Sequence, residues 1–280
     1  KAAIHRKYGP PDVVTIEDIP VPVPKNNEVL IRVVTTTVNR TDCGFRSAEY
    51  FISRFWSGLF KPKYNTLGCE FAGEIVEVGK EVSQFKIGDN VFGFNDQKFG
   101  GHAEYIVVAE TDALATVPVN LPFAHSAAIL EGGHYALSNI KAAKITSGQS
   151  VLVNGGTGAI GSAAIQQAKY LGATVTAVTD TKNVEIVKSL GADVVIDYLK
   201  EDFTKLPHQF DVILDAVGKS TFGKCKPLLK KKGIYISTEL GPYGQNPFLA
   251  LLTPLFRGRK VLFPIPTISK KEVEYLKDLV

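Results

Sequence analysis

The sequence has few cysteines and no long hydrophobic run. Its 280 residues contain three cysteines, Cys43, Cys69 and Cys225, and none of them forms a Cys-x-x-Cys pair. This excludes a disulfide scaffold and a four-thiolate zinc site. No stretch approaches the roughly 20 consecutive apolar residues that a membrane span needs, and the first residues are charged, without the apolar segment of a secretory signal. We therefore expect a soluble chain, with no membrane span, in a reducing, cytoplasmic compartment.

The chain also lacks a strong excess of positive or negative charge. The chain has 32 Lys and Arg against 28 Asp and Glu, a net charge of +4, and its basic residues are scattered apart from runs at 230–232 and 257–260. Such a weak field does not predict nucleic-acid binding. A hydrophobic share of 45% suffices for the core of one large domain or of two ordinary ones, and it excludes disorder and a collagen-like chain.

The first part of the chain is rich in strand-forming residues, whereas the second part alternates strands with helices. Short β-type segments separated by Pro and Gly predict a small antiparallel or barrel-like domain; they lie at 13–16, 28–38, 71–78, 90–94 and 103–109. Later strands alternate with helical segments, which predicts a parallel sheet with helices on both faces; these strands lie at 151–153, 174–178, 194–196, 211–214, 233–237 and 261–263. We therefore expect an α/β protein with a β-rich domain at 1–122 and a doubly wound domain at 123–280.

A glycine motif follows the first strand of the second part. Gly156, Gly158 and Gly161 fit Gly-x-Gly-x-x-Gly between the strand 151–153 and the helix 159–171, which is the setting of a dinucleotide-binding turn. Gly156 then permits the tight turn, Gly158 lets the backbone approach a pyrophosphate, and Gly161 lets the helix lie close to the sheet. The predicted cofactor contacts are Gly156, Thr157, Gly158, Ala159, Ile160 and Gly161. The alternative is a glycine-rich turn without a ligand.

The choice of cofactor is predicted from the end of the next strand. Asp180 suits the ribose diol of NAD(H). Thr179, Thr181 and Lys182 instead suit the 2′-phosphate of NADP(H). Because a threonine directly follows the apolar strand and a cation lies close behind it, we favour NADP(H) over NAD(H). The alternative interpretation of Lys182 is a solvated lysine at the start of a helix.

Four further motifs precede the glycine motif in fixed order. They are Val-Asn-Arg-Thr-Asp at 38–42, Leu-Gly-Cys-Glu-Phe-Ala-Gly-Glu-Ile-Val-Glu-Val-Gly at 67–79, Phe-Lys-Ile-Gly-Asp-Asn-Val-Phe at 85–92 and Gly-His-Ala-Glu-Tyr at 101–105. With them the chain resembles, over essentially its whole length, the zinc-independent quinone oxidoreductase and enone reductase branch of the medium-chain dehydrogenase/reductase superfamily. The resemblance implies a GroES-like β-rich domain, a Rossmann domain and an active site in the cleft between them. It also implies a homodimer, for which we expect residues 259–264 to supply the edge strand.

The resemblance also bears on metal binding. In zinc-dependent members a cysteine stands at the place of Asn39, a histidine at the place of Cys69, and a cysteine or acidic residue near Glu131. An amide oxygen is a weak zinc ligand, and the sequence has no closely spaced cysteines for a structural zinc site. We therefore expect no zinc, and interpret Cys69 as a small buried hydrophobe. A zinc-dependent alcohol dehydrogenase with atypical ligands is the alternative.

Without a metal, hydrogen-bond donors must stabilise the charge that forms on the substrate oxygen when hydride reaches a quinone or an enone. The resemblance implies that Asn39 faces the nicotinamide and is such a donor, and Tyr64 is a second candidate donor or proton source. The alternatives are a turn cap for Asn39 and simple packing for Tyr64.

Aromatic residues are concentrated at 45–60 and predict a wall or lid for a flat, apolar substrate. The predicted substrate contacts are Phe45, Tyr50, Phe51 and Trp56. A satellite hydrophobic cluster and a membrane-surface contact are the alternatives. Further cofactor contacts are expected after the later strands, by strand position or by resemblance; they are Ala216, Val217, Gly218, Thr238, Phe263 and Ile265.

Two expectations concern the whole chain. Family members continue for some tens of residues beyond the helix predicted at 269–280, so we expect this sequence to lack the segment that returns to the β-rich domain. The main hypothesis is an NADPH-dependent reductase of small quinones or enones. A nucleotide-binding protein with a structural or RNA-associated role is a further hypothesis, against which the modest charge counts.

Overall fold

The computed structural model describes residues 1–49, 51 and 54–280. These residues form two compact units: unit 1 contains residues 1–131 and 268–280, and unit 2 contains residues 132–267. The predicted boundary near residue 122 lies just ahead of helix α3 (Phe123–Ala127), which packs on the sheet of unit 1. The change of unit falls instead within helix α4 (Leu130–Ala143).

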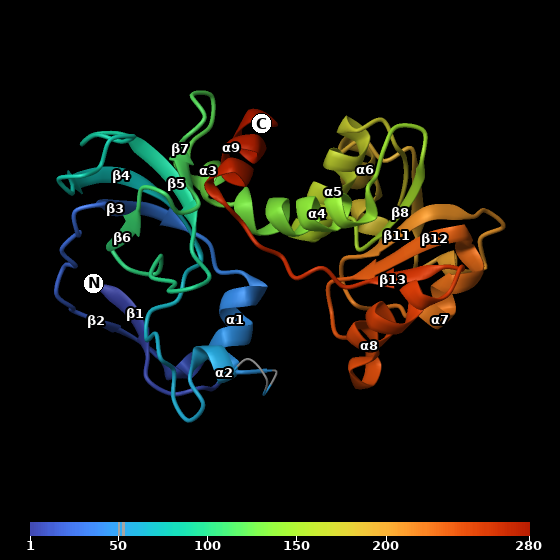
Figure 1. Cartoon of the computed structure of the whole chain (residues 1–280), viewed down its shortest axis with the longest axis horizontal. Helices are drawn as coiled ribbons and strands as arrows, with labels where there is room; N and C mark the ends of the chain where they lie inside the picture. The colour runs from blue at the N-terminus through green and yellow to red at the C-terminus, as the bar shows by residue number, and fades with distance from the viewer. Residues whose placement is uncertain (50, 52–53) are drawn as a thin grey trace. The chain divides into compact units, whose positions relative to one another are not determined.

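Unit 1 is built on antiparallel β-structure (Figure 1). Its strands are β1 (Ala2–His5), β2 (Val14–Glu17), β3 (Glu28–Thr36), β4 (Glu70–Val78), β5 (Asn90–Phe94), β6 (Tyr105–Ala109) and β7 (Leu114–Thr116). Strands β1 and β2 form a hairpin, and the other five form a sheet in the order β6-β3-β4-β5-β7. Alternate residues of these strands, such as Val29 and Ile31 of β3, are fully buried in one core. This agrees with the predicted β-rich domain.

The helices of unit 1 include one from the end of the chain. They are α1 (Arg40–Ser47), α2 (Arg54–Ser57), α3 and α9 (Lys270–Asp278). Helix α9 buries Val273 and Leu276 and packs on β7. Lys270 Nζ donates to the Glu110 carbonyl at 2.8 Å, and Lys277 Nζ donates to Thr116 Oγ1 at 2.7 Å. The last residues of this sequence therefore pack on the β-rich unit, and the expectation of a further returning segment stays a prediction.

Unit 2 is a doubly wound α/β unit. Its six strands are parallel, in the order β10 (Val194–Asp197), β9 (Thr174–Thr179), β8 (Ser150–Asn154), β11 (Phe210–Asp215), β12 (Leu229–Ser237) and β13 (Lys260–Leu262). Its helices are α4, α5 (Ala159–Tyr170), α6 (Val184–Ser189), α7 (Phe222–Cys225) and α8 (Gln245–Leu252). The short 3-10 helices of the two units are η1 (Pro11–Val13), η3 (Thr181–Asn183), η4 (Phe203–Lys205), η5 (Lys226–Leu228), η6 (Pro242–Gly244) and η7 (Thr253–Leu255).

The two faces of this sheet have separate cores. Val151 and Val153 of β8 pack with α4, α5 and α6 on one face. Leu152, which points the other way because side chains alternate along a strand, packs with α7 and α8 on the opposite face (Figure 1). Strands β9 and β11 flank β8, so the direction of winding reverses at β8, and ligands of such sheets bind outside the strand ends at this point. The predicted fold class is confirmed.

No helix of the residues described has both the length and the apolar character that a bilayer crossing demands.

Candidate active site

A glycine turn follows β8 at the carboxyl edge of the unit 2 sheet. Gly155 has a φ of +91°, and a Cβ there would lie 2.3 Å from Val217 Cγ1. The amides of Gly155 and Gly156 both donate to the Val178 carbonyl, at 3.1 and 2.9 Å, which fixes the turn to the end of β9. The tight turn is therefore made by Gly155 and not, as the sequence pattern suggested, by Gly156.

The other glycines of the motif differ in their surroundings. A Cβ on Gly161 would lie 2.0 Å from the Gly155 carbonyl oxygen, so glycine is needed for α5 to begin this close to the turn. Gly158 is the N-cap of α5, and its nearest neighbour to an added Cβ is 3.7 Å away. Thr157, Gly158 and Ala159 are exposed. The first amides of α5, which have no intrahelical acceptors, thus lie at an open edge suited to a phosphate.

The end of β9 places the four residues predicted to choose the cofactor, Thr179, Asp180, Thr181 and Lys182, next to this turn. The Thr179 side chain is 3% exposed, and its hydroxyl has no hydrogen-bond partner among the described residues. Asp180 Oδ1 accepts a 2.6 Å bond from Asn183 Nδ2. Lys182 is exposed in η3. A buried hydroxyl without a partner among the described residues and an exposed cation three positions further along the chain are chemistry that a phosphate-bearing ribose would satisfy.

The later cofactor candidates end the neighbouring strands at the same carboxyl edge. Ala216, Val217 and Gly218 directly follow β11, and Thr238 follows β12, its amide donating to the Asp215 carbonyl at 3.2 Å. Phe263 and Ile265 follow β13, where Ile265 is 80% exposed. The structure therefore brings the predicted cofactor residues together along one edge of unit 2.

In unit 1, Asn39 caps helix α1. Its Oδ1 accepts from the Asp42 amide at 3.0 Å, and the Asp42 carboxylate accepts from the Asn39 amide at 3.2 Å, which together form a capping box. Asn39 Nδ2 faces two buried side chains at the start of β4: it lies 3.0 Å from Sγ of Cys69, which precedes the strand, and 3.4 Å from Glu70 Oε2. The cap that was the alternative interpretation of Asn39 is thus present, and the amide nitrogen remains a donor.

A chain of buried acids lies behind Asn39. Glu70 Oε2 accepts from Thr37 Oγ1 at 2.6 Å, and Glu70 Oε1 accepts from the Glu131 amide at 2.6 Å. Glu131 Oε1 accepts from Thr41 Oγ1 at 2.6 Å. Burial and the nearby carboxylates Glu70 and Asp42 raise the pKa of Glu131 to about 7, and burial raises the pKa of Glu70 as well. Glu131 therefore exchanges protons near neutral pH.

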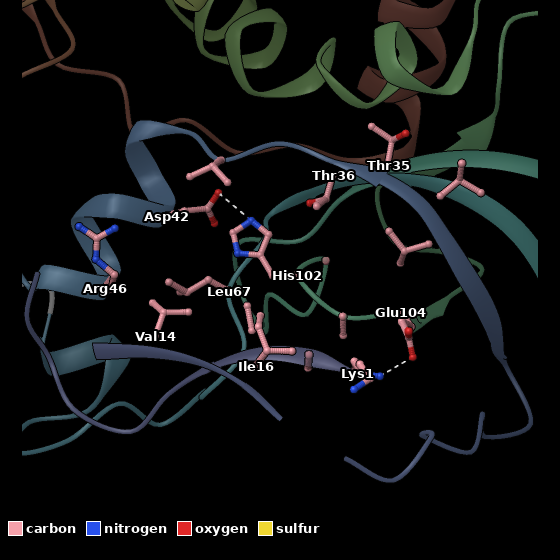
Figure 2. Close-up of a pocket in the computed structure, with 17 residues that line it drawn as sticks. Lys1, Val14, Ile16, Thr35, Thr36, Asp42, Arg46, Leu67, His102 and Glu104 are labelled. Carbon is pink, nitrogen blue, oxygen red and sulfur yellow. Dashed lines mark hydrogen bonds and ion pairs between the residues drawn. The ribbon is translucent and has the colours of Figure 1, made fainter. Parts of the chain in front are cut away.

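Asp42 connects this cluster to a cavity of about 520 Å³ in unit 1. Its Oδ1 accepts from the Gly68 amide at 2.9 Å, and its Oδ2 lies 3.7 Å from His102 Nε2. Figure 2 shows His102 and Asp42 pointing toward one another at the cavity wall, whose other labelled residues include Val14, Ile16 and Leu67. His102 Nε2 also lies 2.7 Å from the Thr37 carbonyl oxygen. His102 thereby supports the segment that carries Asn39.

The predicted substrate aromatics that the structure describes have different surroundings. Phe45 packs edge-to-face on Phe99, with ring centroids 4.9 Å apart, inside unit 1. Phe51 and Trp56 are 64% and 68% exposed, and Tyr50 lies outside the described residues. The ring of Tyr64 is partly buried and has Lys63 Nζ 5.0 Å from its centroid.

Comparison with known proteins identifies the family. Residues 25–119 match the model of the alcohol dehydrogenase GroES-like domain, and residues 159–277 match that of the zinc-binding dehydrogenases. A quinone oxidoreductase of Sus scrofa is 32% identical over 254 residues, which cover 86% of this chain and 74% of the relative. This chain belongs to the medium-chain dehydrogenase/reductase superfamily. The resemblance to its quinone oxidoreductase and enone reductase branch is confirmed, and so are the GroES-like and Rossmann folds.

Other members of the superfamily support the same placement. A 2-methylene-furan-3-one reductase of Solanum lycopersicum is 38% identical over 229 residues, which cover 78% of this chain. The NADPH-dependent alkenal/one oxidoreductase of Arabidopsis thaliana is 36% identical over 228 residues, and in both cases the chain spans 57% of the relative's length. A solved quinone oxidoreductase from Coxiella burnetii superposes with a TM-score of 0.87 at 28% identity, covering 100% of this chain and 86% of that one.

The positions that the resemblance relates to zinc ligands hold Asn39, Cys69 and Glu131. The Asn39 oxygen accepts from the Asp42 amide as the helix cap, and its NH₂ group faces Cys69. Burial and the carboxylates of Asp42 and Glu131 raise the pKa of the Cys69 thiol. No group of three or more His, Cys, Asp or Glu suited to a metal occurs among the described residues.

Three residues of the cluster did not stand out in the sequence as site residues. Glu70 and Thr41 lie within motifs that carried the family resemblance, and Asp42 ends one of them, but nothing in their spacing indicated a contact. Thr41 and Glu131 are 90 positions apart. An acidic residue directly before the apolar residues Phe71 and Ala72, as at Glu70, is the signal that was available, since a buried acid needs partners.

Proposed function

We propose that this chain transfers hydride from NADPH to an α,β-unsaturated carbonyl compound or a quinone, without zinc. Relatives named quinone oxidoreductase, alkenal/one oxidoreductase and 2-methylene-furan-3-one reductase support this activity. The observation that carries the proposal is the turn after β8, where Gly155 and Gly161 meet with no room for a Cβ beside the open start of α5. That is the geometry of a dinucleotide-binding turn.

Each unit has its own role in this proposal. The nicotinamide supplies the hydride when it is bound. Gly156, Thr157, Gly158, Ala159, Ile160 and Gly161 hold the pyrophosphate, and the residues after β11, β12 and β13 line the nicotinamide end. Hydride addition to the β-carbon of an enone leaves negative charge on the carbonyl oxygen, for which Asn39 Nδ2 is the donor and Tyr64 a second one. Phe45, Tyr50, Phe51 and Trp56 contact the substrate, and solvent supplies the proton.

The preference for NADPH rests on Lys182 and Thr179. An NADPH-dependent relative supports it, as do the exposed ammonium group of Lys182 and the unpartnered hydroxyl of Thr179. We expect Lys182→Ala to lower kcat/KM for NADPH about tenfold and to leave kcat/KM for NADH within about twofold, since one charge-assisted hydrogen bond is lost. Initial rates with both cofactors measure this, and an equal loss with both would contradict the role.

Assembly and location complete the proposal. Strand β13 is at one edge of the unit 2 sheet, which supports a homodimer formed through residues 259–264. The cysteine usage supports the proposal of a cytoplasmic location, whereas the alkenal/one oxidoreductase relative is chloroplastic by name. Equilibrium sedimentation tests the dimer, which a monomer at all concentrations would exclude.

The activity itself is tested by the loss of NADPH absorbance with one enone and one quinone, in chelator-treated protein. Turnover of either acceptor that survives the chelator supports the proposal. Activity that disappears with the chelator and returns with Zn²⁺ supports a zinc-dependent alcohol dehydrogenase instead. Tight NADPH binding with no turnover favours a nucleotide-binding role.

A further inference from the structure

Asp215, the last residue of β11, is a carboxylate held in the interior of unit 2. It is 1% exposed. Its Oδ1 accepts from Asn154 Nδ2 at 3.0 Å and from the Val217 amide at 3.4 Å. Its Oδ2 accepts from the Ser220 amide at 2.9 Å and from the Tyr235 hydroxyl at 3.2 Å. A buried carboxylate is tolerated only with such partners, and each of these four donors is neutral.

The donors come from three different places at the carboxyl edge of the sheet. Asn154 ends β8, and Tyr235 lies in β12. The Val217 and Ser220 amides belong to the loop 216–220, which begins directly after Asp215. The Asp215 carboxylate therefore joins two strands to the backbone of this loop. The loop conformation depends on this carboxylate as the hydrogen-bond acceptor.

The same loop packs on the glycine turn. Val217 occupies the space next to Gly155, where a Cβ would come within 2.3 Å of Val217 Cγ1. The Ala216 amide donates to the Asn154 carbonyl at 3.0 Å, one residue before Gly155. A displacement of the loop 216–220 would therefore displace the wall against which the turn is packed.

We propose that Asp215 is a positioning residue for the dinucleotide: it holds the loop 216–220 in the conformation in which Ala216, Val217 and Gly218 meet the cofactor. The inference rests on the proposed function of the unit 2 edge as a dinucleotide site. Asp215 does not itself contact the cofactor, and its effect passes through the two loop amides.

The test measures NADPH binding by isothermal titration calorimetry, with Asp215→Asn as the variant. An amide cannot accept from both pairs of donors, because its NH₂ group would face a backbone N–H. We expect the Kd for NADPH to rise about tenfold. The matched control is Asp211→Asn, at the other end of β11, where the Asp211 carboxylate accepts from Ser150 and Lys230 far from the loop. This control should lower the thermal midpoint and leave the Kd unchanged.

Each outcome is decisive. An unchanged Kd in folded Asp215→Asn overturns the inference, and so does an equal rise in both variants, which would show a general loss of stability. If Asp215→Asn does not fold, Tyr235→Phe replaces it, since it removes one donor of four; a rise in Kd of about threefold supports the inference and no rise overturns it. Absence of NADPH binding by the unmodified chain would instead contradict the proposed function.

Discussion

At Asn39 the two ends of one amide have different partners, which makes the cap and the donor separable. The oxygen caps α1 through the Asp42 amide, and the nitrogen faces Cys69 and Glu70. Serine keeps a capping oxygen but has no NH₂ group, whereas alanine has neither.

We expect Asn39→Ala to lower the free energy of unfolding by about 1 kcal/mol and Asn39→Ser to leave it nearly unchanged. Both variants should lower kcat/KM with an enone about a hundredfold, because each lacks the donor to the developing oxyanion. Urea unfolding and initial rates measure the two effects. A serine variant with full activity would show that Asn39 is only a cap.

Glu131 gives the stability of unit 1 a pH dependence of known sign. Its folded-state pKa is raised from 4.5 to about 7 by burial, so the folded chain binds this proton more tightly than the unfolded chain. The contribution to stability is complete below pH 4.5 and is lost as the pH rises through 7, and it amounts to about 3 kcal/mol at most.

We therefore expect the stability of Glu131→Gln, relative to the unmodified chain, to increase steadily between pH 5 and pH 8. Gln keeps an acceptor for the Thr41 hydroxyl and cannot ionise. Unfolding free energies at four pH values measure this, with the exposed Glu77→Gln as the control that should run parallel to the unmodified chain. A parallel curve for Glu131→Gln would mean that Glu131 titrates as it does in the unfolded chain.

Sequence reasoning selected Asn39 but not the residues that hold it. Asn39 could be identified from the sequence because it lies in one of the motifs that occur in fixed order along the chain. The bond from Thr41 to Glu131 joins residues 90 positions apart, and such a contact depends on where α4 begins relative to α1. No local pattern encodes that, so the acid cluster is visible only in the folded chain.

At the scale of the element, the N-cap and the first turn of α5 contain two glycines with different structural needs. Gly161 has backbone atoms of Gly155 where its Cβ would lie, whereas Gly158 has only one atom, at 3.7 Å. Both have backbone angles that alanine adopts, because neither is among the glycines with positive φ.

Gly161→Ala should therefore lower the free energy of unfolding by about 3 kcal/mol, since α5 must move away from the turn. Gly158→Ala should change it by less than about 1 kcal/mol, but should weaken NADPH binding, because its methyl group would project where we propose that the backbone meets the pyrophosphate. Thermal unfolding and calorimetric titration separate the two effects. Equal stability of both variants would contradict the close contact seen at Gly161.

The elements of unit 2 were largely predictable, and the errors have local causes. All six strands were located because apolar runs alternate with helical patterns. The start of β12 was placed at 233, yet the strand begins at Leu229. Lys232 there has a φ of +72°, and the pairing with β11 shifts register between Phe210 and Val212. The irregular pairing carries three lysines into the strand, which a hydrophobicity pattern does not show.

For the whole molecule, the chain path differs from a simple succession of two domains. The chain leaves unit 1 within α4 and returns to it with α9. The predicted boundary near 122 followed a change in composition, but α3 and α9 are held by tertiary packing on β-strands of unit 1, which composition does not report. Helix α9 buries Val273 and Leu276, at 0% and 3% exposure, and its Lys270 and Lys277 bond to residues 160 and 161 positions away.

Leu276→Ala should therefore destabilise unit 1, although residue 276 follows unit 2 in the sequence. The cost of the cavity is about 3 kcal/mol, and amide hydrogen exchange is expected to accelerate in β7 and α9. In β8 of unit 2 the exchange should remain as in the unmodified chain, because no residue of α9 belongs to that core. The control is Lys271→Ala, at an exposed position of α9, and it should alter hydrogen exchange in neither β7 nor β8. If β8 lost protection together with β7, the two units would unfold as one cooperative body, and the division of the chain into independent cores would be wrong.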